Sequence, residues 1–372
     1  MPIEITEYRS EHESLVKAFN TRLQGHYGAF SFPERCVPGW LPRKNDAGVF
    51  REFHVAVENN VDVRGAFCLR HQPFRTELGL RNVVNYQGIV SEGITDKRYA
   101  LVGPRTILHA LKMHPFMYVL GMGGNTRPLP RLLRSLGWSM VLVPFQFKIL
   151  NGRAFFKNIT FLRKSALRRI FFDVVANIGI GSLTALVLNL SGEKKSASAS
   201  NTAREEDRFG SWADDVWNSA MESYKLIALR DRATMDVLYP EGDRKNIVLH
   251  VVNNDTETIG WAVVRCTQLR NHKQFGNMRL GSIVDCLSLP DEEFNTIDPV
   301  WRYLYNRDVD LVVSNQANSR WCEALARCGF LRGPSNFALS LSPELEELVG
   351  PVAETMKRMH FNRSDGDGPV HL

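Results

Sequence analysis

Hydrophobic and polar positions follow two periods along the chain, and the order of these periods is repeated. From Val309 to Phe330 the sequence VDLVVSNQANSRWCEALARCGF has an apolar run, a polar turn, and apolar residues at helical spacing that end in Gly-Phe. Much earlier, Phe116–Trp138 (FMYVLGMGGNTRPLPRLLRSLGW) has the same plan and ends in Gly-Trp. Short apolar runs favour buried strands, and apolar residues three and four apart favour helices. Each stretch therefore predicts a strand, a turn and a helix.

The residues around these two stretches extend the repeat. Each copy predicts a helix, a β-hairpin, a strand, a helix, the strand–turn–helix stretch and a final strand. In the first copy these elements are expected at 10–23, 52–59, 63–71, 82–90, 100–113, 116–138 and 139–150. In the second copy they are expected at 211–223, 246–254, 258–269, 279–289, 296–308, 309–330 and 336–342. The pattern indicates an internal duplication of one mixed α/β unit, with a period too long for a solenoid.

This duplication predicts the domain boundaries. We expect an N-terminal domain at 1–150 and a C-terminal domain at 205–342, followed by a helix and an acidic tail at 343–372. Residues 151–204 are expected to form an apolar helical linker and a flexible Ser/Lys-rich segment.

The linker contains a strongly apolar stretch at 170–190 that follows a basic flank beginning at Arg163. Its length suits a membrane span, since about 20 apolar residues cross a bilayer. However, Asp173 lies inside it, and a central Asp costs on the order of 3 kcal/mol to insert. Three interpretations remain: a helix buried between domains, a peripheral membrane contact through 163–190, or a true span.

The net charge of +6 hides an asymmetry between the two halves of the chain. Residues 1–200 hold 27 Lys+Arg and 14 Asp+Glu, a balance of +13, whereas residues 201–372 hold 19 and 26, a balance of −7. A basic half attracts phosphates, anionic membrane surface or nucleic acid, or docks on the acidic half of the same chain.

Composition indicates a globular protein of a reducing compartment. The chain is 44% hydrophobic, enough for one large core or two ordinary ones. Its first residues are polar and charged and do not form a secretory signal. The six cysteines show no CxxC pair and are expected to be free thiols. We expect a cytoplasmic location, with the inner face of the membrane as an alternative.

The order of elements, with the strand–Asn–helix–Gly-Phe ending, resembles the GNAT family of N-acyltransferases. Two tandem copies also resemble the FemAB-type aminoacyl transferases. The tail FNRSDGDGPVHL is similar to the ending of GNAT-like proteins associated with exopolysaccharide synthesis. The resemblance implies an α+β fold of two tandem GNAT-like domains, each a central mixed, mostly antiparallel sheet flanked by helices.

The resemblance also implies an acyl-CoA cofactor, either acetyl-CoA or another acyl-CoA. In the family it lies in a splay between the fourth and fifth strands, with its pyrophosphate at a helix N-terminus, where backbone N–H groups favour anions. In the first copy the loop and helix start TDKRYALVGPRTIL offers Arg98, Gly103 and Arg105. In the second copy PDEEFNTIDPVWRY has three consecutive acids, which repel a polyanion.

Two asparagines occupy or lie near the place of a family Asn that helps to hold the cofactor. Asn318 is at that place in the second copy, and Asn125 is near it in the first. The alternative interpretation, which we favour, is that each is a helix N-cap, because Asn is a strong capping residue.

The resemblance implies a Tyr that protonates the leaving thiolate, but Leu133 and Leu325 stand at its two positions. The candidate catalytic residues are therefore Asp285, Glu92 and Tyr86. Asp285 lies in an apolar strand, where an unpaired carboxyl would have a raised pKa and suit a general base. The alternative is an ion pair with an Arg. Glu92 is a second possible carboxylate, and Tyr86 is either a substitute acid or a core residue.

No metal site is predicted. His71, His109 and His114 lack metal-ligand spacing, and the SDGDG segment lacks the distal Glu of a calcium loop.

The expected function is transfer of an acyl group from a small-molecule thioester to an amine or hydroxyl acceptor, in polysaccharide or cell-envelope biosynthesis. One alternative is a catalytically degenerate scaffold or regulator of a membrane-associated polysaccharide machine. Another is a FemAB-like transferase that uses aminoacyl-tRNA, since the basic half suits an RNA backbone. No motif of stacking aromatics is present, so nucleic acid is not an expected partner. The sequence does not predict the oligomeric state.

Overall fold

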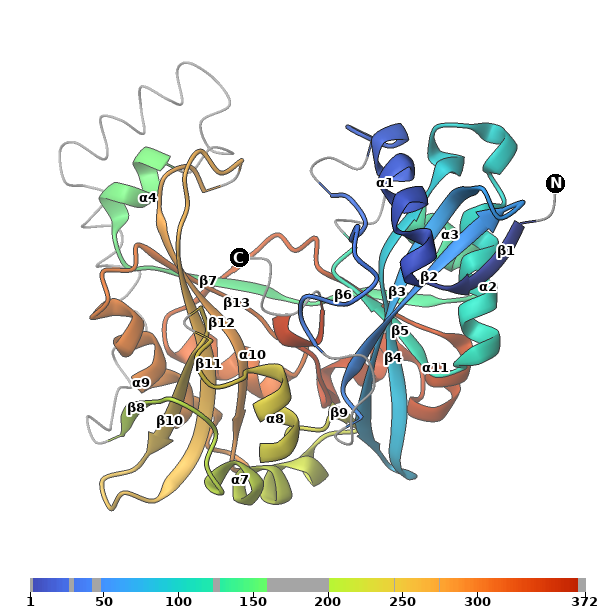
Figure 1. Cartoon of the computed structure of the whole chain (residues 1–372). Coiled ribbons are helices and arrows are strands. Elements are labelled where there is room, and N and C mark those ends of the chain that lie inside the picture. Colours follow the sequence, from blue (N-terminus) through green and yellow to red (C-terminus); the bar gives the residue numbers. More distant parts are fainter. Residues whose placement is uncertain are drawn as a thin grey trace. The chain divides into compact units, whose positions relative to one another are not determined.

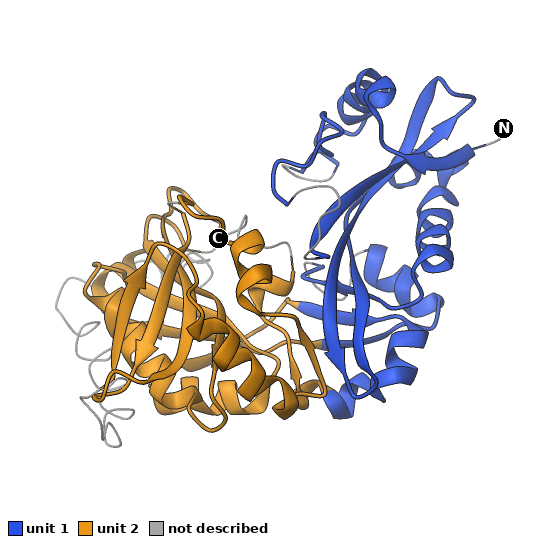
Figure 2. Ribbon diagram, turned by 60° about the horizontal axis from the view of Figure 1, so that its bottom comes forward, with its two compact units in different colours: residues 1–141, 338–355 blue, residues 142–337, 356–372 orange. Residues whose placement is uncertain are grey.

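A computed structural model describes residues 3–26, 30–41, 48–122, 128–158, 201–243, 245–273 and 275–366 (Figure 1). The chain forms two compact units (Figure 2). Unit 1 comprises Met1–Val141 and Ala338–Thr355, and unit 2 comprises Leu142–Phe337 and Met356–Leu372.

Unit 1 is built on a mixed sheet. Its strand order is β1 (Ile3–Glu7), β2 (Phe50–Glu58), β3 (Asp62–Thr76), β4 (Gly79–Ser91), β5 (Met117–Leu120), β15 (Ala338–Leu341) and β6 (Ser139–Leu142). Neighbouring strands from β1 to β4 are antiparallel, β4 and β5 are parallel, and β5 and β15 are antiparallel. Its helices are α1 (Glu13–Arg22), α2 (Val102–Met113), α3 (Pro128–Ser135), α11 (Pro343–Val349) and α12 (Val352–Thr355).

Strand periodicity separates the core of unit 1 into two layers. Phe53, Val55 and Val57 alternate along β2 and pack with Val16 and Phe19 of α1. A second cluster joins β3 and β4 to α2 and α3, and it includes Phe67, Leu69, Val84 and Tyr86 of the strands and Ile107, Ala110 and Leu133 of the helices. Successive strand residues point to opposite faces, so one sheet buries apolar surface under helices on both sides. Each large side chain buried in this way stabilises the fold by about 1.5–3 kcal/mol.

Unit 2 repeats this plan. Its strand order is β14 (Leu331–Gly333), β7 (Phe145–Ile149), β13 (Leu311–Asn315), β12 (Arg279–Ser288), β11 (Thr258–Gln268), β10 (Ile247–Val252) and β8 (Thr202–Glu206). Only β12 and β13 are parallel among these described pairs. A short parallel pair joins β9 (Leu226–Ala228) and β16 (Met359–His360). The helices are α4 (Gly152–Asn158), α7 (Trp212–Ala220), α8 (Arg232–Leu238), α9 (Glu293–Tyr305) and α10 (Ser319–Arg327).

The prediction of an α+β fold with two mixed sheets flanked by helices is confirmed. The unit boundaries differ from the predicted domains 1–150 and 205–342, because the copies exchange strands. Strand β15, from the end of the second copy, lies between β5 and β6 in unit 1, and β7, from the end of the first copy, lies between β13 and β14 in unit 2. The strand expected at 139–150 is accordingly two strands, β6 and β7, separated at Val143–Pro144.

The apolar stretch 170–190 and its basic flank lie outside the described residues. Among the residues that are described, no helix is both long enough and apolar enough to cross a bilayer. All six cysteines lie among the described residues and none of them forms a disulfide, and four of them are buried.

Candidate functional site

The fourth and fifth strands of unit 1 separate early. The parallel ladder of β4 and β5 contains two residue pairs, Val84↔Met117 and Asn85↔Tyr118. Beyond them β4 continues to Ser91 with no β5 partner in the ladder. The described part of β5 therefore forms no ladder with the second half of β4.

A β-bulge lies on β4 directly beyond the separation. Ala66 pairs with Val90 and Cys68 pairs with Gln87, so two residues of β4, Gly88 and Ile89, face one residue of β3. Gly88 has φ of +58°, a left-handed conformation that glycine adopts without strain. Bulges bend a strand and redirect its backbone groups, and they are frequent beside ligand sites.

Helix α2 follows β4 in the sequence and begins at Val102, 11 residues after the strand ends at Ser91. The 3₁₀ turn Lys97–Tyr99 precedes it, and Gly103 and Arg105 lie in its first turn. Arg105 is exposed. Arg98 is also exposed, but its guanidinium is paired with Asp96, with Nη2 and Oδ2 2.6 Å apart. The predicted phosphate-binding residues Arg98, Gly103 and Arg105 thus lie in the 3₁₀ turn and in the first turn of α2, and one of the two arginines is already paired with a carboxylate.

The corresponding splay of unit 2 is filled by the chain itself. The β12–β13 ladder ends at Ile283↔Ser314. Beyond it, the backbone N–H of Ala317 donates to the carbonyl of Phe361 (2.9 Å), and Gln316 forms a β-bridge with Asn362.

The same segment also reaches β12. Nε2 of His360 donates to the carbonyl of Cys286 (3.0 Å), and the Asn362 amide donates to Asp285 (2.6 Å). Residues 360–362 therefore hydrogen-bond to β12 on one side and to the residues that follow β13 on the other, and so connect the two strands where their ladder has ended.

Known structures share this architecture. A structure from Enterococcus faecalis V583, described as a probable N-acyltransferase, matches with a TM-score of 0.51 and 7% identity over 94% of this chain and 75% of that one. A GCN5-related N-acetyltransferase from Anabaena variabilis matches with a TM-score of 0.52 and 10% identity over 91% and 72%. The chain has the GNAT fold.

A weaker likeness links the chain to Saccharomyces cerevisiae N-myristoyltransferase with bound myristoyl-CoA, with a TM-score of 0.49 and 10% identity over 92% of this chain and 78% of that one. No protein-family profile and no curated protein sequence matches the chain. At such identities the similarity is one of fold, and function has to be argued from the site.

In the first GNAT unit, Tyr86 is a core residue. Its ring is fully buried, and its hydroxyl donates to Oγ1 of Thr106 (2.9 Å), which in turn donates to the carbonyl of Gly103 (2.8 Å). Burial raises the pKa of Tyr86 well above its usual range. Its hydroxyl is satisfied within the fold, which favours the core interpretation over that of a substitute acid.

Glu92 is held in a network of charges. Its carboxylate accepts from Arg64 (3.0 Å) and from Arg22 (3.2 Å), and Arg64 also pairs with Glu58 (2.8 Å). Charge-assisted hydrogen bonds of this kind are stronger than neutral ones and hold the carboxylate in place. The geometry therefore assigns Glu92 a role in anchoring β4 to α1 and β3, and gives no support to a general base.

Asp285 is fully buried and also ion-paired. Its Oδ1 accepts from Nε of Arg230 (3.0 Å), and the other edge of Arg230 donates to both oxygens of Asp365 (2.9 Å each). The sequence left open whether Asp285 is a base or the partner of an Arg, and the structure provides that Arg. The partner could not be found by spacing, because Arg230 lies 55 residues earlier.

Only one of the two asparagines that are candidates for holding the cofactor lies in the described part of the chain. Asn318 is the N-cap of α10, and its Oδ1 accepts from the backbone N–H of Arg320 (2.9 Å), as the capping interpretation requires. Asn125 lies outside the described residues.

The start of α9 is acidic. Asp291, Glu292 and Glu293 are consecutive there, and burial together with the two neighbouring acids raises the pKa of Glu293. This acidic start disfavours phosphates.

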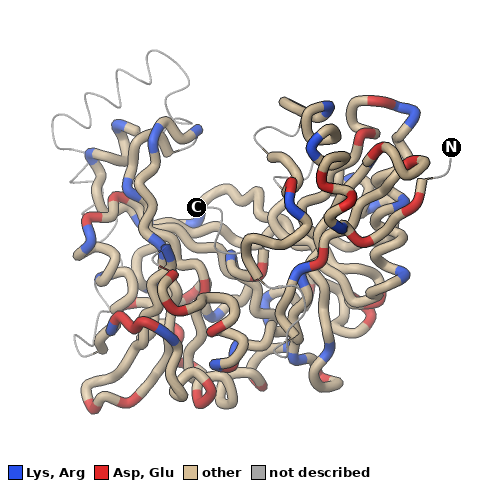
Figure 3. Tube along the Cα trace, viewed as in Figure 1, with Lys and Arg blue, Asp and Glu red and all other residues tan. Residues whose placement is uncertain are grey.

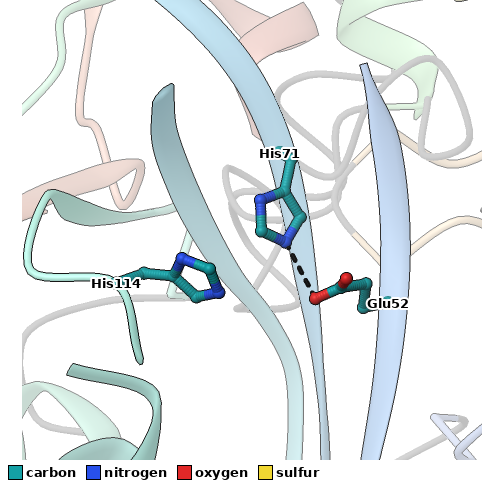
Figure 4. Close-up of side chains that lie close together, drawn as sticks. All are labelled: Glu52, His71 and His114. Atoms are coloured by element: carbon teal, nitrogen blue, oxygen red, sulfur yellow. Dashed lines mark hydrogen bonds and ion pairs between the residues drawn. The ribbon is translucent and has the colours of Figure 1, made fainter. Parts of the chain in front are cut away.

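The structure brings together residues that the sequence treated as scattered. Glu52, His71 and His114 offer ligand atoms within 4.8 Å of one another (Figure 4). The β2–β3 hairpin could have indicated part of this cluster. Its register pairs Phe50 with His71, so Glu52, two residues after Phe50, lies on the same face of the sheet as His71.

Proposed function

We propose that unit 1 binds an acyl-CoA in the splay between β4 and β5, and that the protein transfers the acyl group to an amine or hydroxyl acceptor. The contrast between the two splays carries this proposal. In unit 2 the segment around Asn362 occupies the splay, whereas in unit 1 the ladder stops at Asn85 and a glycine bulge follows. The GNAT fold supports acyl transfer in general, and the donor and acceptor belong to the proposal.

Charge supports a phosphate-bearing ligand at unit 1. From Lys97 to Arg153 the sequence contains no Asp or Glu, so the charged side chains of α2 and α3 are all basic (Figure 3). The N-terminus of α2 adds the partial positive charge of its free N–H groups. At the equivalent helix of unit 2, α9, three acids occupy the start. A CoA pyrophosphate therefore suits α2 and is repelled at α9.

The chemistry rests on positioning and on backbone donors. The acceptor nitrogen or oxygen forms a bond with the thioester carbon, the C–S bond breaks, and the CoA thiolate takes a proton. N–H groups of β4 beyond Asn85 polarise the thioester carbonyl as charge develops on its oxygen. Leu133 replaces the family Tyr, while Glu92 and Tyr86 are engaged, so water carries the acceptor's proton to the thiolate.

The acceptor class follows only from the resemblance of the tail sequence. We propose a sugar or another precursor of polysaccharide or cell-envelope synthesis as the acceptor. A peripheral membrane contact through residues 163–190 belongs to this proposal, because their basic and apolar character suits an anionic surface.

A second candidate function is a non-catalytic scaffold or regulator. It is favoured by the engaged carboxylates Glu92 and Asp285 and by Leu133 and Leu325 at the positions of the family Tyr. This candidate requires that no thioester binds. A FemAB-like use of aminoacyl-tRNA requires instead that tRNA binds with a steep dependence on salt.

Calorimetry of the purified full-length chain with acetyl-CoA and longer acyl-CoAs tests the proposal. We expect binding that weakens at least about tenfold in Arg105→Glu, since a like charge then faces the phosphates. Arg81→Glu is the matched control, because Arg81 is equally exposed in unit 1 but lies at the β3–β4 hairpin. Absence of binding by every thioester would favour the scaffold. If both variants bound acyl-CoA equally well, the ligand would lie away from the start of α2. If the protein bound tRNA and no thioester, the FemAB-like alternative would be favoured.

A further inference from the structure

Three metal-ligating side chains of unit 1 converge from separate elements (Figure 4). Glu52 lies on β2, His71 lies on β3, and His114 follows the last turn of α2. Nε2 of His71 lies 3.0 Å from Oε2 of Glu52, and one ligand atom of each of the three residues lies within 4.8 Å of the others. In a tetrahedral zinc site with bonds of 2.0–2.1 Å, ligand atoms are about 3.3 Å apart. The cluster therefore needs only small side-chain movements to close around an ion.

The site is partly closed to solvent and has one accessible side. His71 is only 2% exposed, and its ring stacks on that of Phe50 with centroids 4.2 Å apart. The Glu52 side chain is 37% exposed, so an ion can enter past it. Because the His71 ring is already immobilised, less side-chain entropy is lost when an ion binds.

The second nitrogen of His71 is also held. The Asn82 side-chain amide lies 3.1 Å from Nδ1 of His71. With the ion absent, Nε2–H donates to Glu52 and the Asn82 NH₂ donates to Nδ1. When Nε2 binds an ion, the proton moves to Nδ1 and the turned amide accepts it through its oxygen. Metal-bound histidines usually donate their other ring N–H to such an outer partner, which fixes the tautomer.

A third imidazole, that of His54, borders the cluster. Nε2 of His54 lies 3.8 Å from the same Glu52 oxygen, and neither ring nitrogen of this buried side chain has a hydrogen-bond partner among the described residues. Buried polar groups without partners are rare in folded proteins, and a bound ion is one of the explanations. His54 is thus placed to complete the coordination or to bind the water of an open position.

We propose that Glu52, His71 and His114 form a binding site for a divalent transition-metal ion of the zinc type. Two imidazoles and one carboxylate are the donor set that such ions prefer, and three protein ligands leave one position open.

The protonation states agree with this assignment. Burial and the neighbouring His71 lower the pKa of His114, so its ring is neutral at pH 7 and has a free lone pair. The imidazoles of His54 and His71 hold the pKa of Glu52 well below its usual range, so its carboxylate is ionised.

The test is a titration of the chelator-treated, full-length protein with ZnCl₂ in competition with a chromophoric chelator, and with CoCl₂ followed by visible absorption. We expect one ion per chain and the intense bands of tetrahedral cobalt. In His114→Ala the affinity should fall at least about tenfold, in line with the loss of one ligand. His109→Ala is the matched control, because His109 lies on α2, the helix that His114 follows, but outside the cluster.

A second variant, Glu52→Gln, keeps the shape of the side chain and removes its charge. It should also lose affinity while its metal-free melting temperature stays close to that of the parent. Binding that is unchanged in both His114→Ala and Glu52→Gln would overturn the proposal, as would the absence of stoichiometric binding by the folded parent protein. None of these outcomes depends on whether acyl-CoA binds.

Discussion

Arg230 and Asp285 form an ion pair in which neither side chain reaches solvent, with Nε of Arg230 3.0 Å from Oδ1 of Asp285. Asp365 pairs with the other edge of the same guanidinium, and Asn362 donates to Asp285. The pair therefore joins strand β12 to the segment that fills the splay of unit 2. Buried pairs contribute little relative to apolar residues, but breaking one leaves a charge without compensation.

Replacement of Asp285 by Asn should destabilise the protein strongly. The substitution leaves Arg230 with one carboxylate and disturbs the bond to Asn362, so we expect a loss of roughly 3–5 kcal/mol in the free energy of unfolding. Urea denaturation measures this. The matched control is Asp298→Asn, which removes the more exposed pair with Arg302 on α9 and should cost less than about 1 kcal/mol. A stable Asp285→Asn protein that fails to transfer acyl groups would instead identify Asp285 as a base.

His360 should make the stability of the protein depend on pH in mildly acid solution. Burial and the nearby Arg230 hold the pKa of His360 well below its usual range. An unfolded His has a pKa of about 6.5, so below that pH the unfolded chain binds a proton that the folded chain does not. Stability is then lost as pH falls below about 6.5, by up to about 1.4 kcal/mol per pH unit.

The measurement is the free energy of unfolding between pH 7.5 and pH 5. His360→Gln should reduce the slope of the profile, because it removes the fully buried one of the histidines whose pKa is lowered. His26→Gln changes an exposed His and should leave the slope as it is. An unchanged slope in His360→Gln would show that another group causes the pH dependence.

Much of the fold could be predicted because its elements are long and strictly periodic. Phe53, Val55 and Val57 alternate along β2, and the apolar faces of α2 and α10 recur at helical spacing. The strand exchange could not be predicted. Both β15 and β7 are short strands of four and five residues. Periodicity indicates which face of a strand is buried but not which strand is its neighbour.

The candidate site was harder to predict, because its contacts join residues far apart in sequence. The Asp in the apolar strand β12 was a valid signal of a buried charge, but Arg230 and Asp365 lie in separate segments. Glu92 stands at the end of β4, where only the tertiary structure brings Arg22 and Arg64 to it. Side chains that meet in this way leave no spacing in the sequence.

Tyr86→Phe separates a core role from a catalytic one. The hydroxyl of Tyr86 donates to Thr106, so its removal should lower the free energy of unfolding by about 0.5–1.5 kcal/mol. Acyl-CoA affinity and acyl transfer should stay within about twofold of the parent values. Denaturant unfolding and calorimetry measure the two effects. A large loss of transfer with unchanged stability would show that Tyr86 acts on the leaving thiolate after all.

Gly93→Ala should disturb the start of α2. A Cβ at Gly93 would lie 2.5 Å from the carbonyl oxygen of Tyr99 and 2.9 Å from Cα of Ala100, so the backbone of that segment has to move. Overpacking of this kind costs about 1–3 kcal/mol. The displaced segment leads directly into α2, so we expect weaker binding of acyl-CoA together with a lower melting temperature.

Gly103→Ala is the matched control within α2. A Cβ there meets no atom closer than 3.9 Å, so the substitution fits and should raise stability by up to about 1 kcal/mol through helix propensity. Calorimetry with acyl-CoA then distinguishes two cases. Affinity that is kept in Gly103→Ala and lost in Gly93→Ala would assign binding to the position of the helix start. Affinity that is lost in both would show that the CoA pyrophosphate approaches the backbone at Gly103 itself, and affinity kept in both would contradict a site at α2.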